Sequence, residues 1–249
     1  MDLFAVLAVC AALSGVETGV DAQAMNQADC DTAKTQYQSS LQSIQLSGKD
    51  RDAIGRVAFA EAANQGDSGL AGVVYTILNR LISGQFGDTV TAIVNAPKQF
   101  EPVHKAGGWT NLPVLSPIQQ TRVETIINLA LEGRLPDLTN GALFFQNPEI
   151  VASREKKGNV SKGLTHFGGS TPSAVIQDHA FYASINRGSP AASANNAPVK
   201  IQAEKKPKAK VWDAYGVAED KALAQAQSWD VFGNGGAGDS VLIGGKETQ

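Results

Sequence analysis

Glu61 lies on the apolar face of a predicted helix, a position where a carboxylate is unexpected. It belongs to the stretch RVAFAEAANQGDSG, residues 56–69. With helical spacing, its series i, i+3, i+4, i+7 contains only apolar residues besides Glu61: Ile54, Val57 and Ala58. Apolar surroundings raise the pKa of a carboxyl group, and the last turn of a helix adds the negative end of the helix dipole. The pattern therefore indicates a general acid that keeps its proton near neutral pH. The alternative is a structural glutamate that pairs with Arg56 or another base.

Capping residues predict the helix that carries Glu61 and the helix after it. Ser47 and Asp50 match a capping box, so we expect a helix over about residues 48–63. A second helix is expected with residues 67–68 at its cap, and Gly72 in it permits close packing. The apolar face of this second helix consists of Leu70, Val73, Val74, Ile77 and Leu81.

Two more helices are expected further along the chain. Asp88 is the expected cap of a short helix that stops before Pro97 and contributes three apolar residues: Val90, Ile93 and Val94. Ser116 and Gln119 form a second capping box around a proline at the first helical position, which predicts a helix closed by Gly133.

Evidence for strands is limited to two short segments. GALFF, residues 141–145, lies between turn signals, and HAFYA, residues 179–183, is a second candidate. Residues 149–178 are rich in Gly, Ser and Lys and are expected to form a long surface excursion. The sequence thus predicts an α+β domain over residues 47–187, mostly helical with a small antiparallel sheet.

The N-terminal segment, residues 1–46, allows two interpretations. Residues 3–15 are apolar but too short to span a bilayer as a helix, and the A-x-A motif at residues 22–24 is typical of a secretory signal. The first basic side chain is only Lys34, which a signal peptide would not show. The alternative is an apolar helix that packs against the protein itself or against a neighbour.

The remaining segments extend the domain at both ends. Residues 25–46 are interpreted as a linker or a surface helix, and a disulfide between Cys10 and Cys30 is possible but not established by the sequence. Residues 188–249 are expected to form a basic linker and a glycine-rich tail, with a possible helix over residues 211–230.

Four segments in order resemble the SleB/CwlJ-type cell wall hydrolases, the family that includes spore-cortex lytic enzymes. RVAFAEAANQGDSGLAGVVYTILNRL is similar to the first family signature, and the matching residues are Glu61, Ala62, Gly69, Val73, Asn79 and Arg80. AIVNAPKQFEP resembles the short helix followed by Gln-Phe. GALFFQNP resembles the family strand that ends in Asn-Pro, and DHAFYA resembles the closing His-x-Phe-Tyr. The resemblance covers about 130 residues and excludes both termini.

The resemblance implies a lysozyme-like domain that cleaves peptidoglycan glycan strands between N-acetylmuramic acid and N-acetylglucosamine. The chemistry it implies is lytic transglycosylation, in which Glu61 protonates the glycosidic oxygen and then accepts the proton of the muramoyl 6-hydroxyl. It also implies a set of substrate-binding candidates: Gln99, Phe100, Phe145, Asn147 and His179. For these, ordinary structural roles are the alternative, and a core aromatic is the favoured role for Phe100. The family often has tyrosine at position 145, so a polar role there is in doubt.

Composition and spacing argue against other classes of function. A net charge of −3 and an aromatic content of 6% do not favour nucleic acid as a partner. The histidines at 104, 166 and 179 are widely spaced and accompany no ligating cysteine pair, so no metal site and no cofactor are expected. A serine nucleophile is unsupported, because no G-x-S-x-G motif occurs.

The rival hypothesis is a bacteriophage virion component, structural or ejected, that carries this fold with local wall-degrading activity or none. The unusual N-terminus, the basic linker and the glycine-rich tail would suit it. Such a component would contact protein partners through residues 1–46 and 188–249. An exported enzyme would require a processed N-terminus and would act in the periplasm or cell envelope, whereas a virion component would keep its N-terminus intact.

Overall fold

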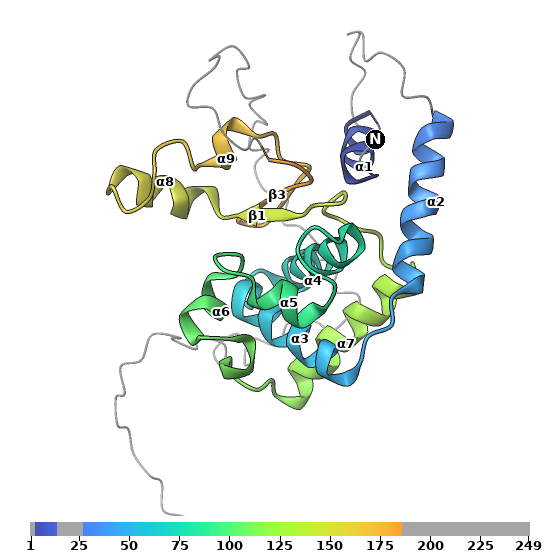
Figure 1. Ribbon diagram of the computed structural model, residues 1–249, viewed down its shortest axis with the longest axis horizontal. Coiled ribbons are helices and arrows are strands. Elements are labelled where there is room, and N and C mark those ends of the chain that lie inside the picture. Colours follow the sequence, from blue (N-terminus) through green and yellow to red (C-terminus); the bar gives the residue numbers. More distant parts are fainter. Residues whose placement is uncertain (1–2, 14–26, 186–249) are drawn as a thin grey trace, which may run out of the picture. The chain divides into compact units, whose positions relative to one another are not determined.

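The computed structural model describes residues 3–13 and 27–185 (Figure 1). In chain order, the helices are α1 (Leu3–Leu13), α2 (Gln27–Ser43), α3 (Gly48–Ala62), α4 (Gly66–Ser83), α5 (Val90–Asn95), α6 (Glu101–Ala106), the 3₁₀ turn η1 (Trp109–Asn111), α7 (Pro117–Leu131), α8 (Pro148–Lys156) and α9 (His166–Gly169). The strands are β1 (Phe144–Gln146), β2 (Ala174–Ile176) and β3 (His179–Tyr182), and they form an antiparallel sheet in the order β1-β3-β2. The α+β class is confirmed, with helices predominating. The predictions for residues 188–249 lie outside the described residues.

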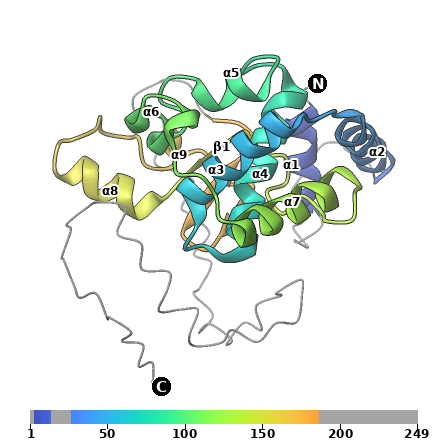
Figure 2. The same ribbon diagram turned by 90° about the horizontal axis from the view of Figure 1, so that it is seen from below.

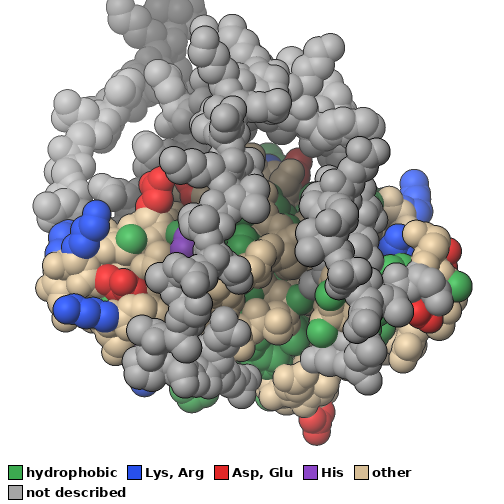
Figure 3. Space-filling view, turned by 90° about the horizontal axis from the view of Figure 1, so that it is seen from above, with side chains coloured by type: hydrophobic (Ala, Val, Ile, Leu, Met, Phe, Trp, Pro, Cys, Tyr) green, Lys and Arg blue, Asp and Glu red, His purple; other side chains and the backbone are tan. Residues whose placement is uncertain are grey.

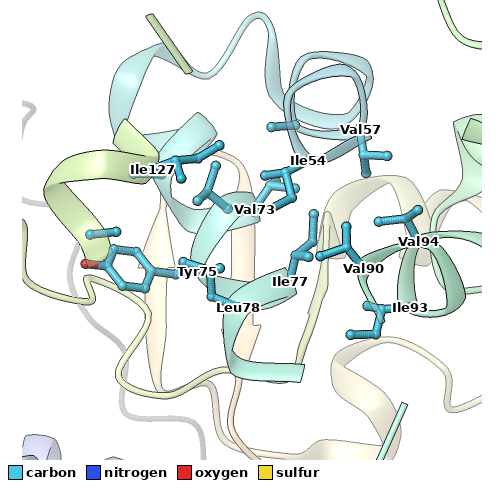
Figure 4. Close-up of a cluster of buried hydrophobic side chains, with 14 of the residues drawn as sticks. Ile54, Val57, Val73, Tyr75, Ile77, Leu78, Val90, Ile93, Val94 and Ile127 are labelled. Atoms are coloured by element: carbon cyan, nitrogen blue, oxygen red, sulfur yellow. The ribbon is translucent and has the colours of Figure 1, made fainter. Parts of the chain in front are cut away.

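Helix α4 is the centre of the core. All of its residues from Gly69 to Arg80 are buried, because α3, α5 and α7 cover it on several sides. Figure 2 shows α3 between α5 and α7, and Figure 4 shows the aliphatic side chains that meet where these helices pack. The predicted apolar faces are confirmed, since Ile54, Val57, Val73 and Ile77 are fully buried.

The capping predictions are partly confirmed. The boxes Ser47–Asp50 and Ser116–Gln119 both form, and they start α3 and α7. The cap expected at residues 67–68 is wrong, because α4 already begins at Gly66 and the carboxylate of Asp67 pairs with Arg122 of α7 instead. The cap expected at Asp88 is also wrong, since the hydroxyl of Thr89 accepts the capping hydrogen bond of α5.

The sheet differs from the prediction in two respects. The strand expected at 141–145 is shifted to Phe144–Gln146, and the excursion 149–178 contains α8, α9 and the unpredicted strand β2. The strand expected at 179–183 is confirmed as β3, whose residues are all buried. The sheet packs on α4 at Gly72, where an added Cβ atom would lie 2.6 Å from the ring of Phe181. Gly72 therefore permits the close packing that the sequence predicts.

The N-terminal helices are joined to the rest of the described chain. A disulfide links Cys10 of α1 to Cys30 of α2. Within the segment predicted as a linker or a surface helix, residues Gln27–Ser43 form α2, and the hydroxyl of Tyr37 donates hydrogen bonds to the side chains of Asn79 and Asp137 (2.7 and 2.9 Å). Helix α1 packs against the protein, since its Phe4 and Leu7 belong to the same buried cluster as the helices that follow. None of the helices in the described ranges is long and apolar enough to cross a membrane.

Candidate active site

Glu61 lies in the last turn of α3, at the boundary between the core and the surface. Its neighbours Ala58 and Ala62 are fully buried, whereas Glu61 is only partly buried and Ala60 is exposed. The apolar face of α3 that carries Glu61 thus reaches the protein surface at this turn. A carboxyl group in this position is mostly desolvated and still accessible from outside.

Burial is the main cause of an unusual titration. Burial and, second to it, the negative charge of Glu101 raise the pKa of Glu61 from 4.5 to a net value of about 7. Two contacts act in the opposite direction, a hydrogen bond from the Glu101 backbone and the positive charge of Arg80. The result is a carboxyl group that can give up and take back a proton near neutral pH.

Arg80, on α4, is a buried cation beside this carboxyl group. Its Nε donates a hydrogen bond to the Leu143 carbonyl (2.7 Å), and its guanidinium lies 4.6, 4.9 and 6.0 Å from the ring centres of Phe86, Phe100 and Phe144. One terminal nitrogen, Nη1, has no hydrogen-bond partner among the described residues. Burial lowers the pKa of Arg80 to about 10, and the charge of Glu61 counteracts that shift.

Glu101, the first residue of α6, is a second carboxylate in this region. Arg154 of α8 donates to both of its carboxylate oxygens (3.0 and 3.1 Å), and Lys105 lies 2.8 Å away. These contacts hold the pKa of Glu101 below its usual value. Two carboxyl groups with pKa values displaced in opposite directions therefore lie close together, one suited to carry a proton and the other fixed in its ionised form.

Phe145 brings three of the predicted substrate-binding residues together. It is half-buried on β1, and its ring centre lies 6.2 Å from that of Phe100 and 5.4 Å from that of His179. Phe100 is only 1% exposed and packs against Arg80, so its ring face is not open to a sugar. Gln99 precedes Phe100, is half-buried, and donates a backbone hydrogen bond to Ala96 (3.2 Å).

Asn147 directly follows β1, and His179 is the first residue of β3, the strand that pairs with β1. The side chain of Asn147 caps α8 by accepting a hydrogen bond from the Ile150 backbone (3.0 Å). His179 begins β3 and is buried, and its Nδ1 has no hydrogen-bond partner in the described part of the chain. Burial lowers the pKa of His179, and the negative charge of Asp178 counteracts this shift.

Gln65 fixes the sheet relative to Glu61. Its amide donates to the Asp178 carboxylate (3.1 Å) and accepts from the Asp178 backbone (3.0 Å), which connects the turn after α3 to the β2–β3 hairpin. This contact was not predicted from the sequence, because 113 residues separate the partners. The pairing of Glu101 with Arg154 was not predicted either. The only local signal for these contacts was the polar character of the side chains.

Within the described ranges, no group of three or more His, Cys, Asp or Glu side chains is arranged to hold a metal ion. Residues 64–182 match the model of a family described as Cell Wall Hydrolase. The matched region includes Arg80, Glu101 and all five substrate-binding candidates, and it begins three residues after Glu61. This part of the chain is therefore similar to enzymes that act on peptidoglycan. Comparison with curated proteins and with solved structures gave no match.

Proposed function

We propose that this protein cleaves peptidoglycan glycan strands between N-acetylmuramic acid and N-acetylglucosamine by lytic transglycosylation, with Glu61 as the only catalytic carboxyl group. The observation that carries the proposal is Glu61 itself, which is mostly desolvated, partly accessible and shifted in pKa to about 7. The similarity of residues 64–182 to cell wall hydrolases supports the substrate class.

The proposed reaction uses the Glu61 carboxyl group twice. In the first step its proton goes to the glycosidic oxygen, the bond from that oxygen to C1 of N-acetylmuramic acid breaks, and the N-acetylglucosamine hydroxyl leaves. In the second step the muramoyl 6-hydroxyl oxygen attacks C1 and gives its proton to the Glu61 carboxylate. A 1,6-anhydro ring forms, the acid is regenerated, and no water is consumed.

The neighbours of Glu61 suit both steps. Burial and the charge of Glu101 keep the proton on the resting carboxyl group, and the positive charge of Arg80 stabilises the carboxylate that exists between the steps. Glu101 is engaged by Arg154 and Lys105, which makes it a poor nucleophile or base. This arrangement favours a mechanism with one catalytic carboxyl group over the two-carboxylate mechanisms of ordinary glycosidases.

We assign substrate contacts to Gln99, Phe145, Asn147 and His179. Phe145 is a partly accessible aromatic ring on β1 that also packs against His179, so we choose it as the surface for the apolar face of a sugar. Phe100 contributes indirectly, because it supports Phe145 from one side and Arg80 from the other. We place the reaction at the cell envelope, where the substrate is, and the Cys10–Cys30 disulfide is in keeping with an oxidising compartment.

Mass spectrometry of the muropeptides released from purified sacculi tests the proposal. Wild-type protein should release products with 1,6-anhydro-muramic acid, and folded Glu61→Gln should release none. Products with reducing ends would exclude transglycosylation and require a positioned water. A Glu61→Gln variant as active as the wild type would remove Glu61 from the mechanism.

A further inference from the structure

Three exposed lysines form a cationic surface at the C-terminal end of α8 and in the turn that follows it. Lys156 is the last residue of α8, Lys157 follows it, and Lys162 lies in the next turn. None of the three forms an ion pair with a residue in the described ranges. We call these three residues the lysine surface. In Figure 3, basic side chains lie next to acidic ones at the left edge of the molecule, on the side where Figure 1 draws α8.

Hydrogen bonds of Glu155 bring the lysines together. Its carboxylate accepts backbone hydrogen bonds from residues 163–165, which folds the chain after Lys162 back onto the end of α8. The backbone of Asn159 also donates a hydrogen bond to the Arg154 carbonyl (2.9 Å), which closes the turn between Lys157 and Lys162. These hydrogen bonds hold the pKa of Glu155 below its usual value and keep it ionised, so its single negative charge offsets part, but not all, of the three positive charges.

The lysine surface is connected to the candidate active site through Arg154. Arg154 holds the carboxylate of Glu101, whose backbone in turn hydrogen-bonds to Glu61. Lys156 and Lys157 follow Arg154 by two and three residues, or about 3–5 Å along the helix axis. The cationic surface therefore begins within one helical turn of a residue that contacts the neighbour of Glu61.

We propose that the lysine surface binds the carboxylates of the stem peptides that are attached to the glycan strand. This inference rests on the proposed function. The amino sugars of the strand are uncharged, whereas its stem peptides carry free carboxylates and are attached to the same N-acetylmuramic acid whose bond is cleaved. A peptide at the scissile sugar would leave the site beside Glu61, and flexible ammonium groups suit carboxylates of variable position.

Stabilisation of α8 and binding of an anionic membrane are alternative roles for these lysines, and both fit the structure less well. Lys156 and Lys157 interact favourably with the C-terminal end of the α8 dipole, but Lys162 lies outside the helix. Surfaces that bind acidic lipids have clusters of about 4–8 basic residues, more than the lysine surface offers. Peptide carboxylates, which need only a few cations near the scissile sugar, agree better with all three positions.

Binding to sacculi tests the proposal without cleavage when Glu61→Gln is the background. The lysine variant carries Lys156→Gln, Lys157→Gln and Lys162→Gln. The control carries Lys34→Gln, Lys49→Gln and Arg134→Gln, which remove the same charge from exposed positions elsewhere. Co-sedimentation is measured with intact sacculi and with sacculi whose peptide carboxylates have been converted to methylamides by carbodiimide coupling, after thermal unfolding has shown that every variant is folded.

The lysine variant should bind intact sacculi about 5- to 20-fold more weakly at low salt, and the difference should vanish at high salt. On amidated sacculi the lysine variant and the control should bind equally. Equal losses on both substrates, or the same loss in the control, would overturn the proposal. So would a lysine variant that binds sacculi normally but fails to bind vesicles containing phosphatidylglycerol.

The outcomes separate this inference from the proposed function. If wild-type protein releases no muropeptides while the lysine variant shows a loss on intact sacculi that is absent on amidated sacculi, the proposed reaction fails and the binding surface stands. If anhydro products are released and the lysine variant binds as tightly as the control, the reaction stands and this inference fails.

Discussion

At the scale of single residues, burial of the Glu61 carboxyl group destabilises its ionised form and at the same time gives it a pKa suited to proton transfer. The fold desolvates its carboxyl group at the end of α3, and the nearby charge of Glu101 disfavours ionisation further. The hydrogen bond from the Glu101 backbone and the positive charge of Arg80 limit the shift. Without these two contacts the pKa would rise further, and the carboxyl group would be a weaker acid. The balance near 7 is what a group that alternates between acid and base requires.

The same balance predicts that Glu61→Gln stabilises the protein at alkaline pH. In the folded state the pKa is about 7, whereas in the unfolded state it is near 4.5, so the folded state binds the proton more tightly. Below pH 4.5 the group is protonated in both states and costs nothing. Between pH 4.5 and 7 the free energy of unfolding falls, by about 3 kcal/mol in total.

Chemical denaturation at two pH values measures this effect. At pH 8, Glu61→Gln should unfold at higher denaturant concentration than the wild type, and at pH 4 the two should nearly coincide. Glu149→Gln, at an exposed position with no contact to Glu61, is the control and should match the wild type at both pH values. A Glu61→Gln variant that is less stable than the wild type at pH 8 would show that the ionised carboxylate is well solvated or paired.

Glu101→Gln tests the electrostatic influence of the second carboxylate on activity. Its negative charge raises the pKa of Glu61, so the neutral amide should lower that pKa. The alkaline limb of the pH–rate profile on sacculi should then move to lower pH, while the rate at acidic pH changes little. A profile that keeps its alkaline limb and loses rate at every pH would instead indicate that Glu101 takes part in the reaction.

At the scale of elements, Gly72 is a point of close approach between α4 and the sheet. A Cβ atom there would lie 2.6 Å from Cζ of Phe181, whose ring is fully buried and has little room to move. Gly72→Ala should therefore lower the free energy of unfolding by about 1–3 kcal/mol, although alanine is the better helix former.

Gly48→Ala is the matched control for this substitution. An added Cβ at Gly48, in the first turn of α3, meets no atom within 4 Å. Gly48→Ala should be neutral or stabilise by up to about 1 kcal/mol, as measured by the same denaturant titration. If both alanine variants had the same stability, the sheet would have to shift away from α4 at little cost.

The elements also show which features a sequence can predict. Capping boxes and apolar faces are local patterns, so α3 and α7 were predicted nearly to the residue. Strand β2 was missed because its three residues are stabilised by pairing with β3 and carry a weak pattern of their own. Glu61 was found because one charge interrupts a local stripe. Glu101, Arg80 and Arg154 act through contacts between distant segments, which residue spacing does not reveal.

At the scale of the whole described chain, helices α1 and α2 are attached to the segment around Asp137 and Gly141, and not to the residues that determine the pKa of Glu61. Tyr37 reaches the carboxylate of Asp137, which also accepts hydrogen bonds from the Asn79 amide and from the backbone of Gly141 (3.0 and 2.9 Å). Helix α1 packs against the same region, because its Phe4 lies beside Gly141. These contacts stabilise the loop that leads into β1, while the groups that determine the pKa of Glu61 lie on other elements.

The Cys10–Cys30 disulfide should therefore affect stability without affecting catalysis. Opening it frees a loop of 20 residues, which should lower the free energy of unfolding by about 2–4 kcal/mol. The variant with Cys10→Ser and Cys30→Ser should show this loss in denaturant titrations and should release muropeptides at the wild-type rate well below its melting temperature. Reductant should reproduce the loss in the wild type and leave the variant unchanged. Reduced activity in the folded variant would mean that α1 and α2 help to position the site, because a disulfide that only restricts the unfolded chain cannot change the rate of the folded enzyme.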